Sequence, residues 1–229
     1  MPRFPDDYGK GGRARMLADI ADELAATRWE TGLDVLDPRV LAAMATVPRE
    51  AFVPEDVRYL AFRNGPVGIG HSQTISQPFI VALMTQLLAP RAGQTILEVG
   101  TGSGYQSAVL AELAGQVFSV EIIAALAQEA GPRLAGLGYA NVEVRHGDGY
   151  DGWPEHAPYD GIVVTAAAPT VPPPLVEQLK PGARLVIPVG LNHAFQTLKL
   201  IEKHMDGGIS SRNVLTVTFV PLTRDLRDD

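Results

Sequence analysis

Short apolar runs alternate with helical stretches between residues 95 and 189, and this alternation constrains the fold more than any other feature of the chain. The apolar runs are TILEV (95–99), VFSVE (117–121), VEVR (142–145), GIVVT (161–165) and ARLVIPV (183–189). Helical stretches separate them over about 104–114, up to about Leu137 and over about 173–180. Strands joined by helices of this length run parallel, in a sheet that helices cover on both faces. The sequence therefore predicts an α/β fold of the Rossmann-like type.

A helical N-terminal cap is expected before this core. Residues 1–12 contain two prolines and three glycines, which interrupt any periodicity and predict a flexible arm. Apolar residues then recur at helical spacing over about 14–27. Asp37 is a good N-cap residue with proline directly after it, which predicts a helix through Met44. The remaining expected elements are a short helix near 55–62, an extended polar loop over 64–77 and a helix that begins at Pro78.

The C-terminal part has the pattern of a β-hairpin. FQTLKLIEK and SRNVLTVTFVPL flank Asp206-Gly207-Gly208, a typical turn sequence. We expect this hairpin to complete the sheet. The predicted division is a flexible arm (1–12), a helical cap with a polar loop (13–90), an α/β core (91–190), and the hairpin with a tail (191–229).

Charge and composition exclude several classes of protein. Nineteen Lys and Arg against 26 Asp and Glu give a net charge of −7, which does not favour binding to nucleic acid. The chain has no cysteine, so it forms no disulfide, thiolate metal site or cysteine nucleophile. Its apolar stretches are too short to span a bilayer, and the first twelve residues do not resemble a signal peptide. We expect a cytoplasmic protein, monomeric by default, without membrane or metal partners.

A glycine-rich loop follows the first strand of the core. It has the order Glu98, Gly100, Gly102, Gly104, Tyr105, with one residue between successive glycines. A dinucleotide-binding loop would require glycine at position 105, so an NAD-dependent dehydrogenase is excluded. An acid two residues ahead of the loop would crowd a pyrophosphate, but it suits a ligand that carries an ammonium group. The spacing points to S-adenosylmethionine.

Two further acids support this interpretation. Glu121 ends the second strand, where a carboxylate can accept hydrogen bonds from both ribose hydroxyls. Asp148 follows the third strand, where it could accept a hydrogen bond from the adenine amino group. The alternative is a tight strand–helix turn with surface acids, but that alternative does not require all three acids at these positions.

Residues 73–78 combine hydroxyl groups with the start of a helix. Thr74 and Ser76 directly precede the helix that Pro78 opens, and free amides there favour an anion such as a carboxylate. Local sequence alone favours a second interpretation, in which Ser76 only caps the helix. Both can hold together.

Longer runs resemble protein-L-isoaspartate O-methyltransferases, from about Met16 to Thr223. TISQP within GIGHSQTISQP (68–78), together with VPREAFVP (47–54), is specific to that family. The other matching runs are ILEVGTGSGYQSAVLA (96–111), RHGDGYDGW (145–153), APYDGIVVTAAAP (157–169), LKPGARLVIPVG (179–190) and FVPLT (219–223).

This resemblance implies a function. Members of the family transfer a methyl group from S-adenosylmethionine to the free α-carboxylate of L-isoaspartyl residues in damaged proteins and peptides. S-adenosylhomocysteine is the other product, and the ester then closes to a succinimide, which initiates repair. The family's essential serine corresponds to Ser76, and Gln73, Thr74 and Ile75 line the substrate site with it. The implied cofactor-binding residues are Glu98, Gly100, Thr101, Gly102, Ser103, Gly104, Glu121, Asp148 and Gly149. Thr223 matches a threonine near the active site of some members.

Two departures from the family pattern concern the loop that admits substrate. Ser72 stands where many relatives have glycine, and residues 64–70 lack the usual aspartate-x-proline-leucine-proline sequence. These departures concern peptide preference rather than chemistry, and a carboxyl methyltransferase dedicated to one peptide substrate is the alternative. A cofactor-binding protein without catalysis is a third interpretation, against which the intact Ser76, Glu98, Glu121 and Asp148 argue.

Overall fold

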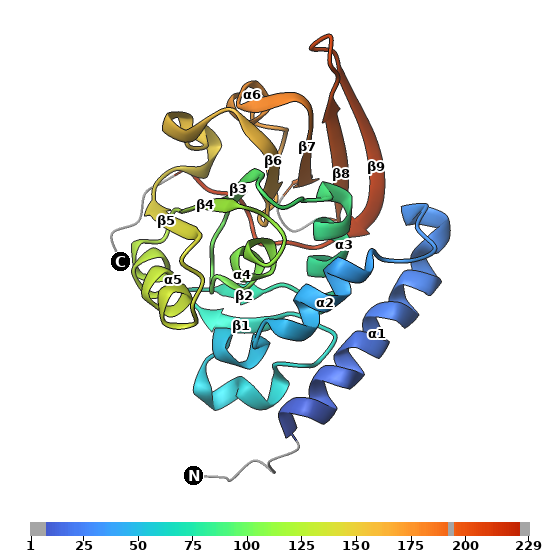
Figure 1. Cartoon of the computed structure of the whole chain (residues 1–229), viewed down its shortest axis with the longest axis vertical. Coiled ribbons are helices and arrows are strands. Elements are labelled where there is room, and N and C mark those ends of the chain that lie inside the picture. Colours follow the sequence, from blue (N-terminus) through green and yellow to red (C-terminus); the bar gives the residue numbers. More distant parts are fainter. Residues whose placement is uncertain (1–7, 192–194, 225–229) are drawn as a thin grey trace.

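A seven-stranded mixed sheet organises the protein. A computed structural model describes residues 8–191 and 195–224 (Figure 1). Within those residues the strand order is β5-β4-β3-β6-β7-β8-β9, with β3 to β7 parallel and β8 and β9 antiparallel. The strands are β3 (Thr95–Val99), β4 (Gln116–Glu121), β5 (Val142–His146), β6 (Tyr159–Val164), β7 (Leu179–Val189), β8 (Gln196–Lys203) and β9 (Ile209–Val217). The predicted core strands and the C-terminal hairpin are confirmed.

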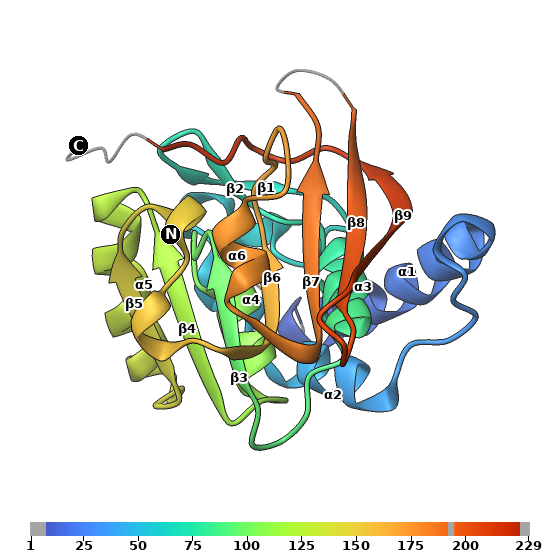
Figure 2. The ribbon, with the colours of Figure 1, turned by 90° about the horizontal axis from the view of Figure 1, so that it is seen from above.

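Both faces of the sheet are buried, by unequal layers. Ile96 packs with the helices of one face, whereas its neighbours Leu97 and Val99 pack on the other. The first face carries α3 (Pro78–Leu88), α4 (Tyr105–Ala111) and α5 (Ala124–Gly136). The second face carries the short α6 (Pro173–Glu177) and the turns around Trp153 (Figure 2). The prediction of helices on both faces is therefore confirmed, and the α/β fold is Rossmann-like.

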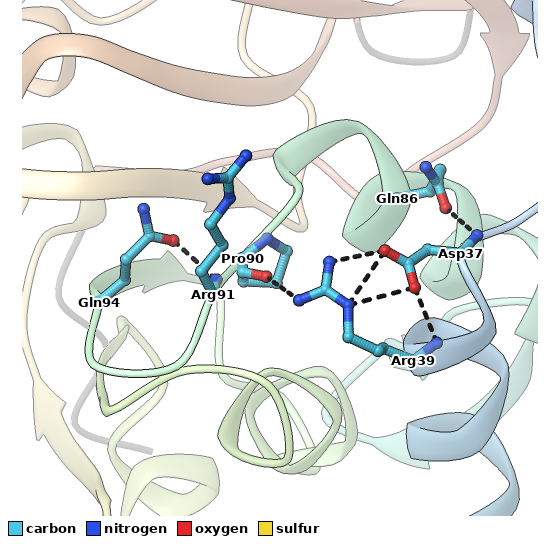
Figure 3. Close-up of polar contacts among 6 residues, drawn as sticks. All are labelled: Asp37, Arg39, Gln86, Pro90, Arg91 and Gln94. Atoms are coloured by element: carbon cyan, nitrogen blue, oxygen red, sulfur yellow. Dashed lines mark hydrogen bonds and ion pairs between the residues drawn. The ribbon is translucent and has the colours of Figure 1, made fainter.

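The N-terminal helices form a layer outside α3 and α4. Helix α1 (Tyr8–Thr31) packs on α2 (Pro38–Thr46) and α3. Asp37 caps α2 as predicted, because its carboxylate accepts a hydrogen bond from the amide of Arg39 at 2.8 Å. The amide of Asp37 in turn donates to Oε1 of Gln86 on α3 at 2.6 Å (Figure 3). The Arg39 guanidinium also reaches the carbonyl of Pro90, so this one turn joins α2 to the segment that leads into the sheet.

The start of α1 corrects the prediction of a flexible arm over 1–12. Residues 1–7 lie outside the described residues, but 8–12 are helical. Glycine is required at position 12, because a Cβ there would lie 2.5 Å from Cδ2 of Phe62. The glycine that suggested an irregular chain is therefore a contact between α1 and a later segment.

The polar segment over 64–77 is also more ordered than expected. It contains a short antiparallel hairpin, β1 (Val67–Gly70) with β2 (Gln73–Ile75), where an extended loop was predicted. Its two turn residues, His71 and Ser72, have φ values of 51° and 57°. Ser72, the first departure from the family pattern, therefore occupies a left-handed position that favours glycine. The segments 49–52 and 55–60 are 3₁₀ helices.

Two neighbouring glycines of α1 give opposite expectations for substitution by alanine. We expect Gly12→Ala to lower the free energy of unfolding by about 1–2 kcal/mol, because the added methyl group overlaps Phe62. Gly11→Ala meets no atom within 4 Å and should raise stability by up to about 1 kcal/mol through helix propensity. Urea denaturation of both variants measures the difference. Stabilisation by both substitutions would mean that α1 does not pack on Phe62.

Candidate active site

Two cavities meet at the carboxyl ends of the central strands. The glycine-loop cavity has a volume of about 270 Å³. The Ser76 cavity has a volume of about 320 Å³ and lies on the side of β9 and α3. A connecting space of about 40 Å³ lies between the glycine loop and Ser76. Thr74 and Thr165 line all three, so these two residues mark the junction.

The glycine loop is shaped by contacts that exclude side chains. Gly100 has a φ of 95°, and a Cβ there would lie 2.5 Å from Oγ1 of Thr165. The Thr165 hydroxyl donates to the carbonyls of Val99 and Gly100, which fixes the loop against the end of β6. Gly104, with a φ of 90°, is the N-cap of α4 and packs against Leu134. The loop is thus held by Thr165 on one side and by Leu134 on another, and it exposes main chain to the cavity.

Glu121 holds the glycine loop from the neighbouring strand. Its Oε2 accepts a hydrogen bond from the amide of Gly102 at 2.8 Å, and its Oε1 accepts one from the amide of Ile123 at 3.0 Å. Burial raises the pKa of Glu121, and the amide hydrogen bonds oppose that shift. The carboxylate lines the glycine-loop cavity and has room for further donors.

Glu98 lies behind the loop rather than on the cavity. The side chain is fully buried and accepts hydrogen bonds from Ser107 of α4 and from Ser119 of β4. Its Oε1 has no hydrogen-bond partner among the described residues. Burial raises the pKa of Glu98 to about 8, so the carboxyl group is largely protonated at neutral pH. Without a cation beside it, Glu98 therefore mostly lacks the negative charge that the sequence predicts at this position.

Thr101 and Ser103, two other predicted cofactor residues, line the connecting space. The Thr101 hydroxyl lies 2.6 Å from the hydroxyl of Ser119, and so joins the hydrogen-bond network of Glu98. The carbonyl of Ser103 accepts a hydrogen bond from Arg133 of α5 at 2.9 Å. Both residues thereby tie the glycine loop to elements on either side of it.

Of the two residues expected to contact adenine, Gly149 lines the cavity and Asp148 does not. Gly149 lines the glycine-loop cavity, and a Cβ there would collide with Val99. The Asp148 carboxylate does not line the cavity; it accepts hydrogen bonds from the Tyr150 amide at 2.9 Å and from Arg224 at 3.1 Å. Main chain, rather than the carboxylate, therefore faces the cavity at the end of β5.

Ser76 lies where the two cavities approach each other. It lines the Ser76 cavity and the connecting space. The N-cap of α3 is Gln77, and no side chain caps this helix within the described region. The interpretation of Ser76 as a helix cap, which local sequence favoured, is therefore wrong, and its hydroxyl is available to a ligand. Of the other predicted substrate residues, Gln73 lines the glycine-loop cavity, and Ile75 is buried beside the connecting space.

Arg49 is a residue that the sequence analysis did not single out. Its guanidinium is fully buried, donates to the carbonyl of Ala61 and to the carbonyl of Ser76, each at 2.7 Å, and lies 4.6 Å from the centre of the Tyr105 ring. Nη1 has no partner among the described residues, and burial lowers the pKa of the side chain. Arg49 thus fixes the main chain of Ser76 from beneath. The only signal in the sequence was an arginine inside the run VPREAFVP, whose other residues are apolar except Glu50.

The sequence analysis also did not single out Thr165 and Phe195, although Thr165 lies in the run APYDGIVVTAAAP and Phe195 begins FQTLKLIEK. Phe195 is 83% exposed and lines the Ser76 cavity. Thr223 lines the glycine-loop cavity, together with the chain that follows β9. Across the part of the chain that the structure describes, no cluster of His, Asp or Glu could hold a metal ion, and no helix is long and apolar enough to cross a membrane.

Comparisons with known proteins agree on one family. A sequence model of protein-L-isoaspartate(D-aspartate) O-methyltransferase matches residues 22–227. The chain is 56% identical over 218 residues to protein-L-isoaspartate O-methyltransferase 2 of Syntrophobacter fumaroxidans, a match that covers 95% of this chain and 88% of the relative. It is 57% identical over 208 residues to protein-L-isoaspartate O-methyltransferase 2 of Polaromonas sp. strain JS666, covering 91% and 99%.

Solved structures show the same fold. A protein-L-isoaspartate O-methyltransferase superposes with a TM-score of 0.79 at 28% identity, and the match covers 93% of this chain and 67% of that one. A Plasmodium falciparum protein in complex with S-adenosyl-L-homocysteine superposes with a TM-score of 0.74 at 24% identity, covering 90% and 98%.

The buried carboxyl group of Glu98 gives a prediction for the pH dependence of stability. Its pKa rises from an ordinary 4.5 to about 8 on folding, so the folded protein holds the proton more tightly. The contribution of this proton to the free energy of unfolding is complete below about pH 4.5 and is lost as the pH rises through about 8. We expect the unfolding free energy of the wild type to fall relative to that of Glu98→Gln between pH 5 and pH 8.5, measured by urea denaturation. A constant difference between the two proteins would show that Glu98 is not protonated in the folded state.

Proposed function

The chain belongs to the protein-L-isoaspartate(D-aspartate) O-methyltransferase family, and we propose that it methylates the free α-carboxylate of L-isoaspartyl residues in damaged proteins and peptides. S-adenosylmethionine is the proposed methyl donor. The observation that carries the proposal is the position of Ser76, whose side chain caps no helix and lies between the two cavities. One cavity then takes the donor and the other takes the acceptor peptide.

The glycine-loop cavity suits S-adenosylmethionine in the chemistry of its wall. Glu121 keeps acceptor capacity for the ribose hydroxyls while two amides hold it. Glu98 lies behind this wall, and its ionisation would balance the charge of an ammonium group bound beside the loop. For Asp148 to bind adenine, its carboxylate must accept a hydrogen bond from the adenine amino group in addition to the one from Arg224. The proposed cofactor residues are Glu98, Gly100, Thr101, Gly102, Ser103, Gly104, Glu121, Asp148 and Gly149.

The acceptor needs orientation rather than activation. An α-carboxylate has a reference pKa of about 3.5 and is ionised at neutral pH, so no general base is required. We propose that the Ser76 hydroxyl donates a hydrogen bond to this carboxylate, with Gln73, Thr74 and Ile75 completing the substrate site. The residues around the connecting space exclude water and align the acceptor oxygen.

The reaction is balanced without a proton donor or a metal. S-adenosylmethionine supplies a methyl group bonded to a positively charged sulfur. A carboxylate oxygen forms the new bond to the methyl carbon as the carbon–sulfur bond breaks, which gives a methyl ester and S-adenosylhomocysteine. Charge disappears during this transfer, so the protein contributes mainly by holding the reactants in line. The amide nitrogen of the peptide then attacks the ester carbonyl and methanol leaves, which gives a succinimide and initiates repair.

The proposed setting is a cytoplasmic monomer that acts on proteins and peptides. A chain without cysteine needs no oxidising compartment, and a net charge of −7 disfavours nucleic acids and anionic lipid surfaces as partners. For the rest of the chain we propose the division expected from the sequence: a cap with the substrate loop (13–90), a cofactor-binding core (91–190), and a hairpin with a tail (191–229).

Paired peptides test the proposed function. We expect labelled S-adenosylmethionine to transfer base-labile label to a peptide that contains isoaspartate and not to the same peptide with normal aspartate, because only the former presents an isolated α-carboxylate. Scintillation counting of the peptides measures this difference. Absence of label on both, with cofactor binding confirmed by titration, would instead favour an enzyme dedicated to one peptide or a protein without catalysis.

Two substitutions should separate the acceptor from the cofactor. Ser76→Ala should lower kcat by at least about tenfold through loss of carboxylate alignment, with little change in the dissociation constant of S-adenosylmethionine. Glu121→Ala should weaken cofactor binding by about tenfold, because it removes a charged acceptor from the ribose. Calorimetric titration and initial rates measure both effects. Equal losses of affinity in the two variants would contradict the separate roles.

A further inference from the structure

The Ser76 cavity carries a carboxylate that methyl transfer does not use. We propose that this cavity is a subsite for a lysine or arginine next to the isoaspartyl residue, with Glu23 as its recognition group. This inference rests on the proposed function and adds to it a preference among isoaspartyl peptides.

The cavity has the shape and wall of a site for a long side chain. Its volume is about 320 Å³, and Pro66, Ile80, Leu215 and Phe219 give it apolar walls. Ser76 lies in the same wall, so a side chain that enters the cavity belongs to a residue close to the bound α-carboxylate. An aliphatic stem with a polar head is the ligand that such a wall accommodates best.

Glu23 is the one charged residue in this wall among those the structure describes. It reaches the cavity from α1, and its Oε2 accepts hydrogen bonds from Nδ2 of Asn64 at 2.6 Å and from Nε2 of Gln77 at 2.8 Å. Both donors are neutral, so the carboxylate is oriented but keeps its charge. No described lysine, arginine or histidine forms an ion pair with it. A held carboxylate without a counter-charge fits a cation supplied by the ligand.

Two further acids near Glu23 add to its negative electrostatic potential. Asp19 and Asp22 line a shallow depression along α1, and Glu23 lines both this depression and the Ser76 cavity. The two aspartates attract a basic peptide during approach, whereas only Glu23 lies where it can contact a side chain inside the cavity. The same arrangement repels acidic flanking residues.

The position of Asn64 links this subsite to the loop in which the chain departs from its family. An aspartate at 64 would bring a second carboxylate against Glu23, where the amide now donates a hydrogen bond. Pro66, from the same loop, forms part of the apolar wall. The departure at Asn64 thus sets the charge beside Glu23 in the cavity that would select the flanking residue.

The test uses three isoaspartyl peptides that differ only in one flanking residue, lysine, leucine or glutamate, placed on either side of the isoaspartate in two series. For the wild type we expect kcat/KM to fall in the order lysine, leucine, glutamate in at least one series. Glu23→Gln keeps the acceptor for Asn64 and Gln77 but removes the charge. It should lower the ratio of kcat/KM for lysine over leucine by about fivefold.

Asp22→Asn is the matched control. It removes the same charge from the same helix, at a position that lines the outer depression but not the Ser76 cavity. We expect it to leave the lysine-to-leucine ratio within about twofold of wild type. Thermal unfolding and cofactor titration of both variants show that each is folded, and a ratio within one variant is insensitive to its active fraction.

The outcomes separate this inference from the proposed function. Equal ratios in wild type and Glu23→Gln would overturn the subsite, and an equal fall in Asp22→Asn would mean that long-range charge, not Glu23, sets the preference. If the wild type methylates all three peptides equally, the inference fails while the proposed function stands. If the wild type methylates no isoaspartyl peptide, the proposed function itself fails.

Discussion

The buried guanidinium of Arg49 is the interaction on which the active site depends. A charge removed from water requires hydrogen-bond acceptors, and Arg49 finds them in main-chain carbonyls at Ala61 and Ser76. It also stacks on Tyr105, the first residue of α4. One side chain therefore joins the 3₁₀ segment of the cap, the loop that leads into α3, and the helix that follows the glycine loop. The position of Ser76 relative to the glycine loop follows from this contact.

The same constraint has an electrostatic consequence for the proposed reaction. Arg49 has no acidic partner among the described residues, and the pKa of its side chain is lowered because burial disfavours the charge. An anion held by the Ser76 hydroxyl would lie at the residue whose carbonyl Arg49 binds, and would partly offset the charge of Arg49. On the other side of the connecting space, Glu121 lies beside the glycine loop, where a positively charged donor is proposed, and Glu98 lies behind the loop. The residues around the site therefore suit an anion and a cation that meet at Thr74 and Thr165.

Patterns that depend on neighbouring residues were predictable from the sequence. The core strands, the cap of α2 by Asp37 and the start of α3 at Pro78 follow from periodicity and local stereochemistry, and the structure confirms them. Features set by contacts between distant segments were not predictable. Gly12 looked like a helix breaker because its partner, Phe62, is fifty residues away in the chain.

The active site shows the same division. The glycine spacing and Glu121 follow from strand ends that meet at one edge of the sheet, so their proximity could be predicted. Burial of Glu98 behind the loop depends on two serines from different elements. The Ser76 hydroxyl is free because Gln77, one residue later, is the N-cap of α3. Local sequence preference placed the cap at Ser76. The burial of Arg49 was not predicted, because its acceptors, the carbonyls of Ala61 and Ser76, come from later segments.

A crystal structure of the complex with S-adenosylhomocysteine and an isoaspartyl peptide would test the central claim most directly. The account predicts S-adenosylhomocysteine in the glycine-loop cavity with its ribose on Glu121. It predicts the α-carboxylate of the peptide within hydrogen-bond distance of the Ser76 hydroxyl, facing the sulfur across the space between Thr74 and Thr165. A carboxylate bound away from Ser76, or a sulfur directed away from the connecting space, would contradict it.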